Sequence, residues 1–178
     1  MDDADHIALI RSRVRDVPNF PKPGILFRDI TTVLADPSAW QVTVERLSET
    51  VQPWAPDVVV GIESRGFILG AALAYRLGLG FVPVRKPGKL PHSVHSRSYE
   101  LEYGSDALEI HTDAIGPGHR AVVVDDLLAT GGTARATTEL VRECGGMVAG
   151  VAVLIELIDL CGREQLPGDV PCAALLAY

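Results

Sequence analysis

Residues 121–133, AVVVDDLLATGGT, carry three patterns that together decide the fold. The apolar start, AVVV, is too short for a helix and rich in valine, which is typical of a strand buried on both faces of a parallel sheet. Asp125 and Asp126 follow directly, at the end of a strand where open α/β sheets usually bind ligands. The small residues of 129–133 then precede a helical pattern over 134–143, so backbone amides and the helix dipole would face an anion there.

The same stretch could be only a strand, a turn and a capped helix, with Asp, Thr and Gly as turn residues. A plain turn, however, has no use for paired carboxylates beside a phosphate-binding loop. A phosphorylated sugar uses both, because its hydroxyls donate to Asp125 and Asp126 and its phosphate enters the loop. The predicted loop residues are Ala129, Thr130, Gly131, Gly132 and Thr133. Neither the Walker pattern nor the Rossmann glycine pattern occurs here.

The composition predicts a single domain that acts on a small molecule. The chain has 178 residues, of which 47% are hydrophobic, enough for one well-buried core. A net charge of -7 and a pI near 5.1 argue against nucleic-acid binding. The three cysteines are widely spaced without a C-x-x-C pattern, so neither a disulfide framework nor a zinc site is predicted. Without a membrane span of ~18 apolar residues or a basic leader, we expect no membrane contact and a cytoplasmic location.

The N-terminal third is predicted to hold two helices joined by a stiff segment. Helical spacing of apolar residues runs through 3–16, and Pro18 would end that helix. The following NFPKPG is irregular, with two prolines that restrict the backbone. Asp36 then caps a second helix, whose apolar stripe continues to Val51.

A second buried strand, 57–62, leads through Glu63, Ser64 and Arg65 into a helix over 67–77. This repeats the order of strand, polar turn and helix seen at 121–133. The arginine presents a planar fork suited to phosphate oxygens at a helix N-terminus, so the turn is a candidate second anion site. The alternative is an arginine paired with a surface acid.

Basic residues follow the third strand, 81–84, in an otherwise acidic chain. The stretch RKPGK could be a solvated charge run, or Lys86 and Lys89 could neutralise a leaving group at the second anion site. Residues 90–104 are predicted to form a long loop, and long loops in compact domains often act as lids. Further strands are predicted at 108–111, 147–155 and 170–176.

The motif V-V-V-D-D-L-L-A-T-G-G-T resembles the phosphoribosyl pyrophosphate loop of type I phosphoribosyltransferases. The residues L-L-A within it resemble those of family members that act on adenine. FPKPGILFRDIT resembles their adenine-binding hood, and GIESRGF resembles their pyrophosphate loop, in which the peptide before Ser64 would be cis. SYELEYG resembles their flexible catalytic loop. The resemblance extends over roughly 17–162.

The resemblance implies a mostly parallel twisted sheet flanked by helices, an α/β fold. One domain would span 1–178, with a hood at about 1–35, a core at about 36–178 and a lid loop at about 86–104. The resemblance also implies a homodimer, in which basic residues near Lys86 can act across the subunits.

The resemblance further implies a reaction in which adenine displaces diphosphate from phosphoribosyl pyrophosphate, giving AMP. Glu102 would be the acid/base residue, with Tyr103 beside it in the lid, and Asp125 and Asp126 would be catalytic through the ribose. Base-binding residues would be Leu26, Phe27, Arg28, Leu127 and Leu157. Pyrophosphate-binding residues would be Glu63, Ser64, Arg65, Lys86 and Lys89. Mg²⁺ would be held through substrate and water, with Asp125 as the one candidate protein ligand.

Three alternatives remain open at this point. The phosphate-binding parts do not select the base, so xanthine, hypoxanthine or guanine could replace adenine, and only the hood motif argues against them. A regulator that senses phosphoribosyl pyrophosphate and binds DNA would need an added basic module, which the chain lacks. A structural α/β domain without chemistry would leave the paired acids and the basic stretch unexplained.

Overall fold

The computed structural model describes residues 3–100 and 105–178. The chain divides into two compact units, Met1–Arg46 and Leu47–Tyr178, and the division falls within helix α3 (Pro37–Val51). The predicted hood falls within the first of these units. No helix of the described residues is long and apolar enough to cross a membrane.

The first unit contains an N-terminal helix, a two-stranded antiparallel hairpin and a short helix before α3 begins. These elements are α1 (Asp3–Arg13), β1 (Arg15–Pro18), β2 (Leu26–Asp29) and α2 (Thr31–Ala35). The predicted first helix ends earlier than expected, because residues 15–18 form β1. Val17 is β-branched and precedes a proline, which disfavours the helical backbone at that position. Its partner across the hairpin is Phe27.

Helix α3 begins where the sequence predicts. Asp36 Oδ1 accepts hydrogen bonds from the backbone N–H groups of Ser38 and Ala39, both at 3.0 Å. Pro37 occupies the first helical position, where its missing N–H costs nothing. These hydrogen bonds, together with the Arg13 Nε–Asp36 Oδ2 ion pair at 2.7 Å, hold the pKa of the Asp36 carboxyl below its usual value.

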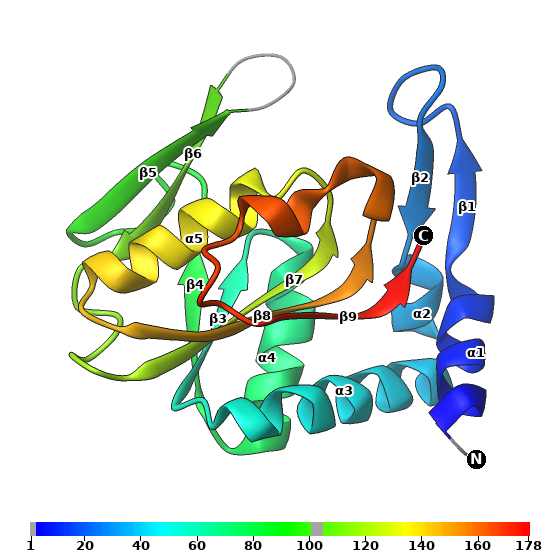
Figure 1. Ribbon diagram of the computed structural model, residues 1–178, viewed down its shortest axis with the longest axis horizontal. Helices are drawn as coiled ribbons and strands as arrows, with labels where there is room; N and C mark the ends of the chain where they lie inside the picture. Colours follow the sequence, from blue (N-terminus) through cyan, green and yellow to red (C-terminus); the bar gives the residue numbers. More distant parts are fainter. Residues whose placement is uncertain (1–2, 101–104) are drawn as a thin grey trace. The chain divides into compact units, whose positions relative to one another are not determined.

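The second unit is built on a five-stranded sheet with the strand order β4-β3-β7-β8-β9, and every neighbouring pair in it is parallel (Figure 1). Apolar residues fill the central strands, and all five residues of β3 are buried. The strands are β3 (Val58–Ile62), β4 (Gly80–Val84), β7 (Arg120–Leu128), β8 (Met147–Glu156) and β9 (Cys172–Ala177). The predicted α/β fold class is confirmed.

Helices α4 (Arg65–Leu77) and α5 (Gly132–Glu143) lie on opposite faces of this sheet (Figure 1). Helix α4 connects β3 to β4 in one direction along the sheet, and α5 connects β7 to β8 in the other. Since such crossovers are right-handed, the reversal places the two helices on opposite faces. The reversal occurs between β3 and β7, and α/β sheets bind ligands at the carboxyl ends of the strands at such a switch point.

Part of the predicted lid loop is a β-ribbon. Strands β5 (Val94–Glu100) and β6 (Ser105–His111) pair antiparallel, and a bridge between Arg85 and Glu109 joins the ribbon to the chain after β4. The sequence pattern predicts a loop at β5, because few of its residues are apolar. Short 3-10 turns complete the unit: η1 (Gln52–Trp54), η2 (Ile158–Leu160) and η3 (Gly162–Gln165).

Candidate active site

A cavity of about 320 Å³ lies at the carboxyl ends of β3 and β7, at the switch point. It gathers residues from the turn after β3, the segment after β4, and the end of β7 with its loop. Its described lining residues are Glu63, Ser64, Arg65, Lys86, Tyr99, Asp125, Asp126, Leu127, Ala129 and Thr133. All of them except Tyr99 are residues that the sequence assigned to a site, so the described chain brings the two predicted anion sites and the paired acids to one cavity.

Asp125 and Asp126 lie on β7 itself, which continues to Leu128, beyond the predicted end of the strand at Val124. The pairing of β7 with β3 stops at Val124, whereas its pairing with β8 extends to Leu128. One edge of β7 is therefore free of β3 at the two acids. The sequence pattern predicts a strand that ends at Val124, because two adjacent carboxylates are rare inside a strand that is paired on both sides. At these two acids β7 still pairs with β8 but no longer with β3.

The two acids differ in their surroundings. Asp126 is only 5% exposed, and its Oδ2 pairs with Arg65 Nε at 2.5 Å. Asp125 Oδ1 accepts a hydrogen bond from the Asp126 backbone N–H at 2.8 Å. Burial, and then the negative charge of Asp126, raise the pKa of the Asp125 carboxyl well above its ordinary value. A ligand that donates hydrogen bonds or brings positive charge would relieve this cost.

Helix α4 approaches β7 closely at Gly66. A Cβ at Gly66 would lie 2.7 Å from the Val124 carbonyl oxygen and 2.9 Å from Asp125 Oδ1, so no larger residue fits. The helix N-terminus therefore lies directly beside the acids, with Arg65 at its first position. The Glu63–Ser64 peptide bond is cis, as the family resemblance implied.

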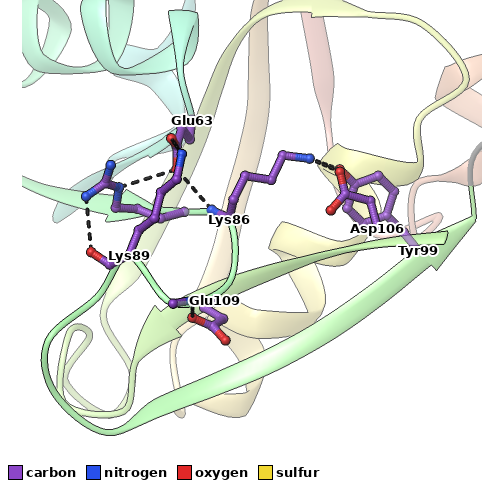
Figure 2. A network of polar contacts seen from close by, with 8 residues as sticks. Glu63, Lys86, Lys89, Tyr99, Asp106 and Glu109 are labelled. Carbon is purple, nitrogen blue, oxygen red and sulfur yellow. Dashed lines mark hydrogen bonds and ion pairs between the residues drawn. The ribbon is translucent and has the colours of Figure 1, made fainter.

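The basic segment after β4 is held by Glu63 (Figure 2). The Glu63 carboxylate pairs with Lys89 Nζ and accepts hydrogen bonds from Arg85 Nε at 3.3 Å and from the Lys86 backbone N–H at 3.0 Å. Burial raises the pKa of the Glu63 carboxyl, but these hydrogen bonds outweigh it, so the pKa is lowered. Glu63 therefore stays ionised and fixes the cations at the cavity, which is a supporting role for an acid beside an anion site.

The Lys86 ammonium points away from Glu63 towards the ribbon (Figure 2). It pairs with Asp106 Oδ2 and donates to Tyr99 Oη at 3.0 Å, while that hydroxyl donates to Asp106 Oδ2 at 3.3 Å. Burial lowers the pKa of Lys86, but the contacts with Asp106 and Tyr99 outweigh it and raise the pKa. The hydrogen bond from Lys86 lowers the pKa of Asp106 in turn.

The glycine loop after β7 packs backbone to backbone on the turn η3. Gly131 has a φ of +87° and caps α5, and a Cβ there would lie 2.2 Å from the Gly162 carbonyl oxygen. A Cβ at Gly162 would lie 2.1 Å from the Ala129 carbonyl oxygen. Arg163 fixes η3 by a two-pronged ion pair with Glu156 at the end of β8, at 3.0 and 2.5 Å. The position of the loop amides therefore depends on η3.

A larger cavity of about 530 Å³ lies beside the same loop. Thr130 and Gly132 line it, together with Arg135 of α5, Gln165 of η3 and Tyr99 of the ribbon. Since Tyr99 also lines the first cavity, its side chain borders both. Two faces of the glycine loop are thus open to a ligand: Ala129 and Thr133 towards the first cavity, and Thr130 and Gly132 towards the second.

The predicted base-binding residues occur in both units. In the second unit, Leu127 lines the first cavity and Leu157 directly follows β8, where its N–H donates to the Leu128 carbonyl at 2.9 Å. In the first unit, β2 carries the others: Leu26 is 45% exposed, the Phe27 ring packs edge-on against Phe20 with 5.1 Å between centroids, and Arg28 pairs with Asp16. Their role in base binding stays a prediction.

Two predicted residues, Glu102 and Tyr103, lie outside the described residues. Among the described residues, no group of three or more His, Cys, Asp or Glu side chains could hold a metal ion. The chemistry of the cavity nevertheless fits Mg²⁺ carried by a substrate, because such an ion keeps several waters and needs only one or two carboxylates. Asp125 is the carboxylate suited to this role, since Arg65 already pairs with Asp126.

Sequence reasoning missed four residues that support the site: Tyr99, Asp106, Gly162 and Arg163. Tyr99 and Asp106 stand opposite each other on the ribbon, and that pairing could not be read from the sequence, where Tyr99 fell in a predicted loop and Asp106 in no predicted element. Gly162 and Arg163 begin a polar turn with no motif of its own. The one available signal was a glycine followed by an arginine shortly after a buried strand, and this is common in turns.

Comparison with known proteins gives the family. The phosphoribosyl transferase domain family matches residues 41–165. The adenine phosphoribosyltransferase of Synechococcus sp. is 62% identical over 169 residues, which cover 95% of this chain and 98% of that protein. The crystal structure of the enzyme of the same name from Thermoanaerobacter pseudethanolicus superimposes with a TM-score of 0.94 at 49% identity, covering 97% of this chain and 99% of the other.

The Saccharomyces cerevisiae adenine phosphoribosyltransferase, solved in complex with adenine and an imino-altritol bisphosphate, is 40% identical with a TM-score of 0.91 and covers 97% of this chain and 99% of its own. These relatives match the chain over nearly its whole length. The chain therefore belongs to the phosphoribosyltransferase family, among the adenine phosphoribosyltransferases.

Proposed function

We propose that the chain transfers the 5-phosphoribosyl group of phosphoribosyl pyrophosphate to N9 of adenine, giving AMP and diphosphate. The observation that carries this proposal is the single cavity in which Asp125 and Asp126, the glycine loop and Lys86 meet. A ribose with phosphate groups at both ends matches that arrangement, because acids suit its hydroxyls while amides and cations suit its phosphates. The names of the relatives support adenine as the base.

Asp125 and Asp126 would bind the ribose hydroxyls and stabilise positive charge on the sugar ring. Breaking the bond between C1 and diphosphate builds this charge in the transition state, and carboxylates already fixed beside the ring would stabilise it. In the protein without substrate, the two adjacent carboxylates are unfavourable, since burial and mutual repulsion raise the pKa of Asp125. Substrate hydroxyls and the developing charge would offset that cost where catalysis needs it.

The leaving diphosphate needs positive charge. Three basic residues would supply it: Lys86, Lys89 and Arg65. Lys86 and Arg65 line the cavity, and Lys89 pairs with Glu63, which also lines it. Substrate-bound Mg²⁺, with Asp125 as the candidate protein ligand, would add Lewis-acid stabilisation of the same oxygens. The backbone of Ala129, Thr130, Gly131, Gly132 and Thr133 would hold the 5′-phosphate at the start of α5.

Glu102 remains the proposed acid/base residue at the base, with Tyr103 beside it, on the family resemblance alone. General acid/base catalysis of this type typically raises the rate ~100- to 10,000-fold.

A homodimer is the proposed assembly. Helix α4 supports it with an apolar outer face, on which Ile68 is 45% and Tyr75 91% exposed, seven positions apart and therefore on one side of the helix.

The first test is a spectrophotometric assay of nucleotide formation from phosphoribosyl pyrophosphate and Mg²⁺, with adenine, guanine, hypoxanthine and xanthine offered in turn. We expect AMP from adenine and little product from the other three. Efficient use of another purine would replace adenine in the proposal, and no product from any base would remove the transferase activity.

The acid pair is tested by Asp125→Asn combined with Asp126→Asn. Both affinity for phosphoribosyl pyrophosphate and turnover should fall, with kcat/KM reduced on the order of 100-fold or more, because ground-state and transition-state contacts to the ribose are both lost. The matched control replaces two exposed acids that do not line the cavity, Asp113→Asn with Asp169→Asn, and should leave kcat/KM unchanged. Full activity of the first double variant would refute the ribose site.

A further inference from the structure

Asp106 on β6 is a carboxylate one contact away from the cavity, and the proposed reaction leaves it without a role. It does not line the cavity, but it pairs with the ammonium of Lys86, which does. Its neighbour across the ribbon is Tyr99, whose hydroxyl contacts both Lys86 Nζ, at 3.0 Å, and Asp106 Oδ2, at 3.3 Å. Figure 2 shows the lysine side chain extended to reach this pair.

Lysine is poorly suited to precise anion binding without such support. Its ammonium sits on a flexible four-carbon stem with three rotatable donors, and immobilising that stem costs conformational entropy. Asp106 and Tyr99 occupy two of the three donors and fix the end of the stem. Among the residues that the structure describes, this leaves one donor for a ligand, and a ligand bound there finds the ammonium already ordered.

We propose that Asp106 and Tyr99 form a clamp that positions the Lys86 ammonium for the diphosphate group of the substrate. The clamp rests on the proposed function, in that it assigns positioning residues to the diphosphate half of that site. Asp106 and Tyr99 act through Lys86 and are not themselves diphosphate ligands. Both are fixed by the backbone, since they are direct partners in the β5–β6 ladder.

The clamp residues lie close in sequence to the segment that carries the proposed acid/base residue. Tyr99 and Asp106 flank residues 101–104 in the chain, and Glu102 lies in that segment. Glu63 holds Lys89 and the Lys86 backbone in a comparable way from the other side, so the whole basic segment is held between two carboxylates.

The clamp is tested by isothermal titration of inorganic diphosphate with Mg²⁺ into the full chain, together with steady-state kinetics. Asp106→Asn removes the charge and keeps the shape. We expect the Kd for diphosphate and the KM for phosphoribosyl pyrophosphate to rise about three- to tenfold, a modest effect because the pair is about one-third exposed. The KM for adenine should stay unchanged. Asp113→Asn, an exposed acid just beyond β6, removes the same charge and should change none of these values.

A double-mutant cycle separates positioning from a general structural role. Lys86→Met alone should weaken diphosphate binding, and adding Asp106→Asn to it should weaken binding no further, because Asp106 acts only through the ammonium. Additive effects would overturn the clamp, as would an Asp106→Asn variant that binds diphosphate as tightly as the wild type or more tightly. Tighter binding would identify Asp106 as a competitor for Lys86.

Tyr99→Phe keeps the ring and removes only the hydroxyl, so it serves if Asp106→Asn does not fold. We expect a two- to threefold rise in the Kd for diphosphate, smaller than for Asp106→Asn because the ion pair between Lys86 and Asp106 is kept, and an unchanged Kd would overturn the clamp. Failure of the proposed function gives a different result. A wild-type chain that makes no AMP from adenine refutes the transferase, whereas a wild-type chain that makes AMP, with variants that bind diphosphate normally, refutes the clamp alone.

Discussion

Asp125 illustrates at the scale of one residue how a site is kept at the expense of stability. Its raised pKa, caused by burial and by Asp126, means that the ionised carboxylate is less favourable in the folded chain than in the unfolded chain. The sign follows from linkage: above the folded pKa the residue destabilises the fold, and this cost disappears as pH falls through the folded pKa towards 3.8, the ordinary value.

Asp125→Asn should therefore make the chain more stable at neutral pH while lowering its activity. The amide oxygen can still accept the Asp126 N–H, so the backbone contact survives. Thermal unfolding followed by circular dichroism should give a higher midpoint than the wild type at neutral pH, with the difference shrinking in acid. Asp113→Asn, an exposed acid, should give little change at either pH. A lower midpoint at neutral pH for Asp125→Asn would contradict the raised pKa.

At the scale of elements, the glycine loop depends on a turn that follows it by some thirty positions in the chain. Gly162 in η3 and Gly131 in the loop approach so closely that neither tolerates a Cβ without a backbone shift. Arg163 ties the same turn to β8 through Glu156. The amides proposed to bind the 5′-phosphate are therefore held from two directions, by α5 on one side and by η3 on the other.

Gly162→Ala tests this support. The added methyl would meet the Ala129 carbonyl oxygen at 2.1 Å, and only movement of the loop can relieve that contact. Because small displacements of binding groups are costly, the KM for phosphoribosyl pyrophosphate should rise about tenfold or more, while the KM for adenine changes little. Gly168→Ala is the matched control, since nothing lies within 4 Å of a Cβ there. Equal kinetics for the two variants would contradict a supporting role for η3.

The elements that the sequence predicted well are those with a strong local pattern. The buried strands β3 and β8, and the start of α3 at its Asp36 cap, follow from apolar runs and one capping side chain. The errors occur where partners distant in sequence decide the structure. Residues 15–18 form β1 because β2 is there to pair, and residues 94–100 form β5 because β6 returns beside them.

At the scale of the whole molecule, the site could be predicted as far as its motifs extend. The acids, the glycine loop and the turn at Arg65 were found because each combines a strand end with residues of distinctive chemistry. Their meeting in one cavity follows from the strand order, which reverses between β3 and β7. Asp106 and Gly162 could not be found in this way, because an aspartate in a strand and a glycine in a turn have no distinctive pattern until their partners are known.

The proposed homodimer is also a property of the whole molecule, and the outer face of α4 makes it testable. Tyr75 is 91% exposed and Ile68 45% exposed on that face, and an interface there would remove this apolar surface from water. Since two-fold dimers use the same patch on both subunits, a charge placed there meets its own copy across the interface. Light scattering should give twice the 19.1 kDa chain mass for the wild type and a mass near 19.1 kDa for Ile68→Glu with Tyr75→Glu.

The control variant, Met147→Glu, alters another exposed apolar residue, on β8, and should stay dimeric. A wild-type mass near 19.1 kDa at micromolar concentration would refute the homodimer. A double variant that is still dimeric would show that the interface does not lie on α4.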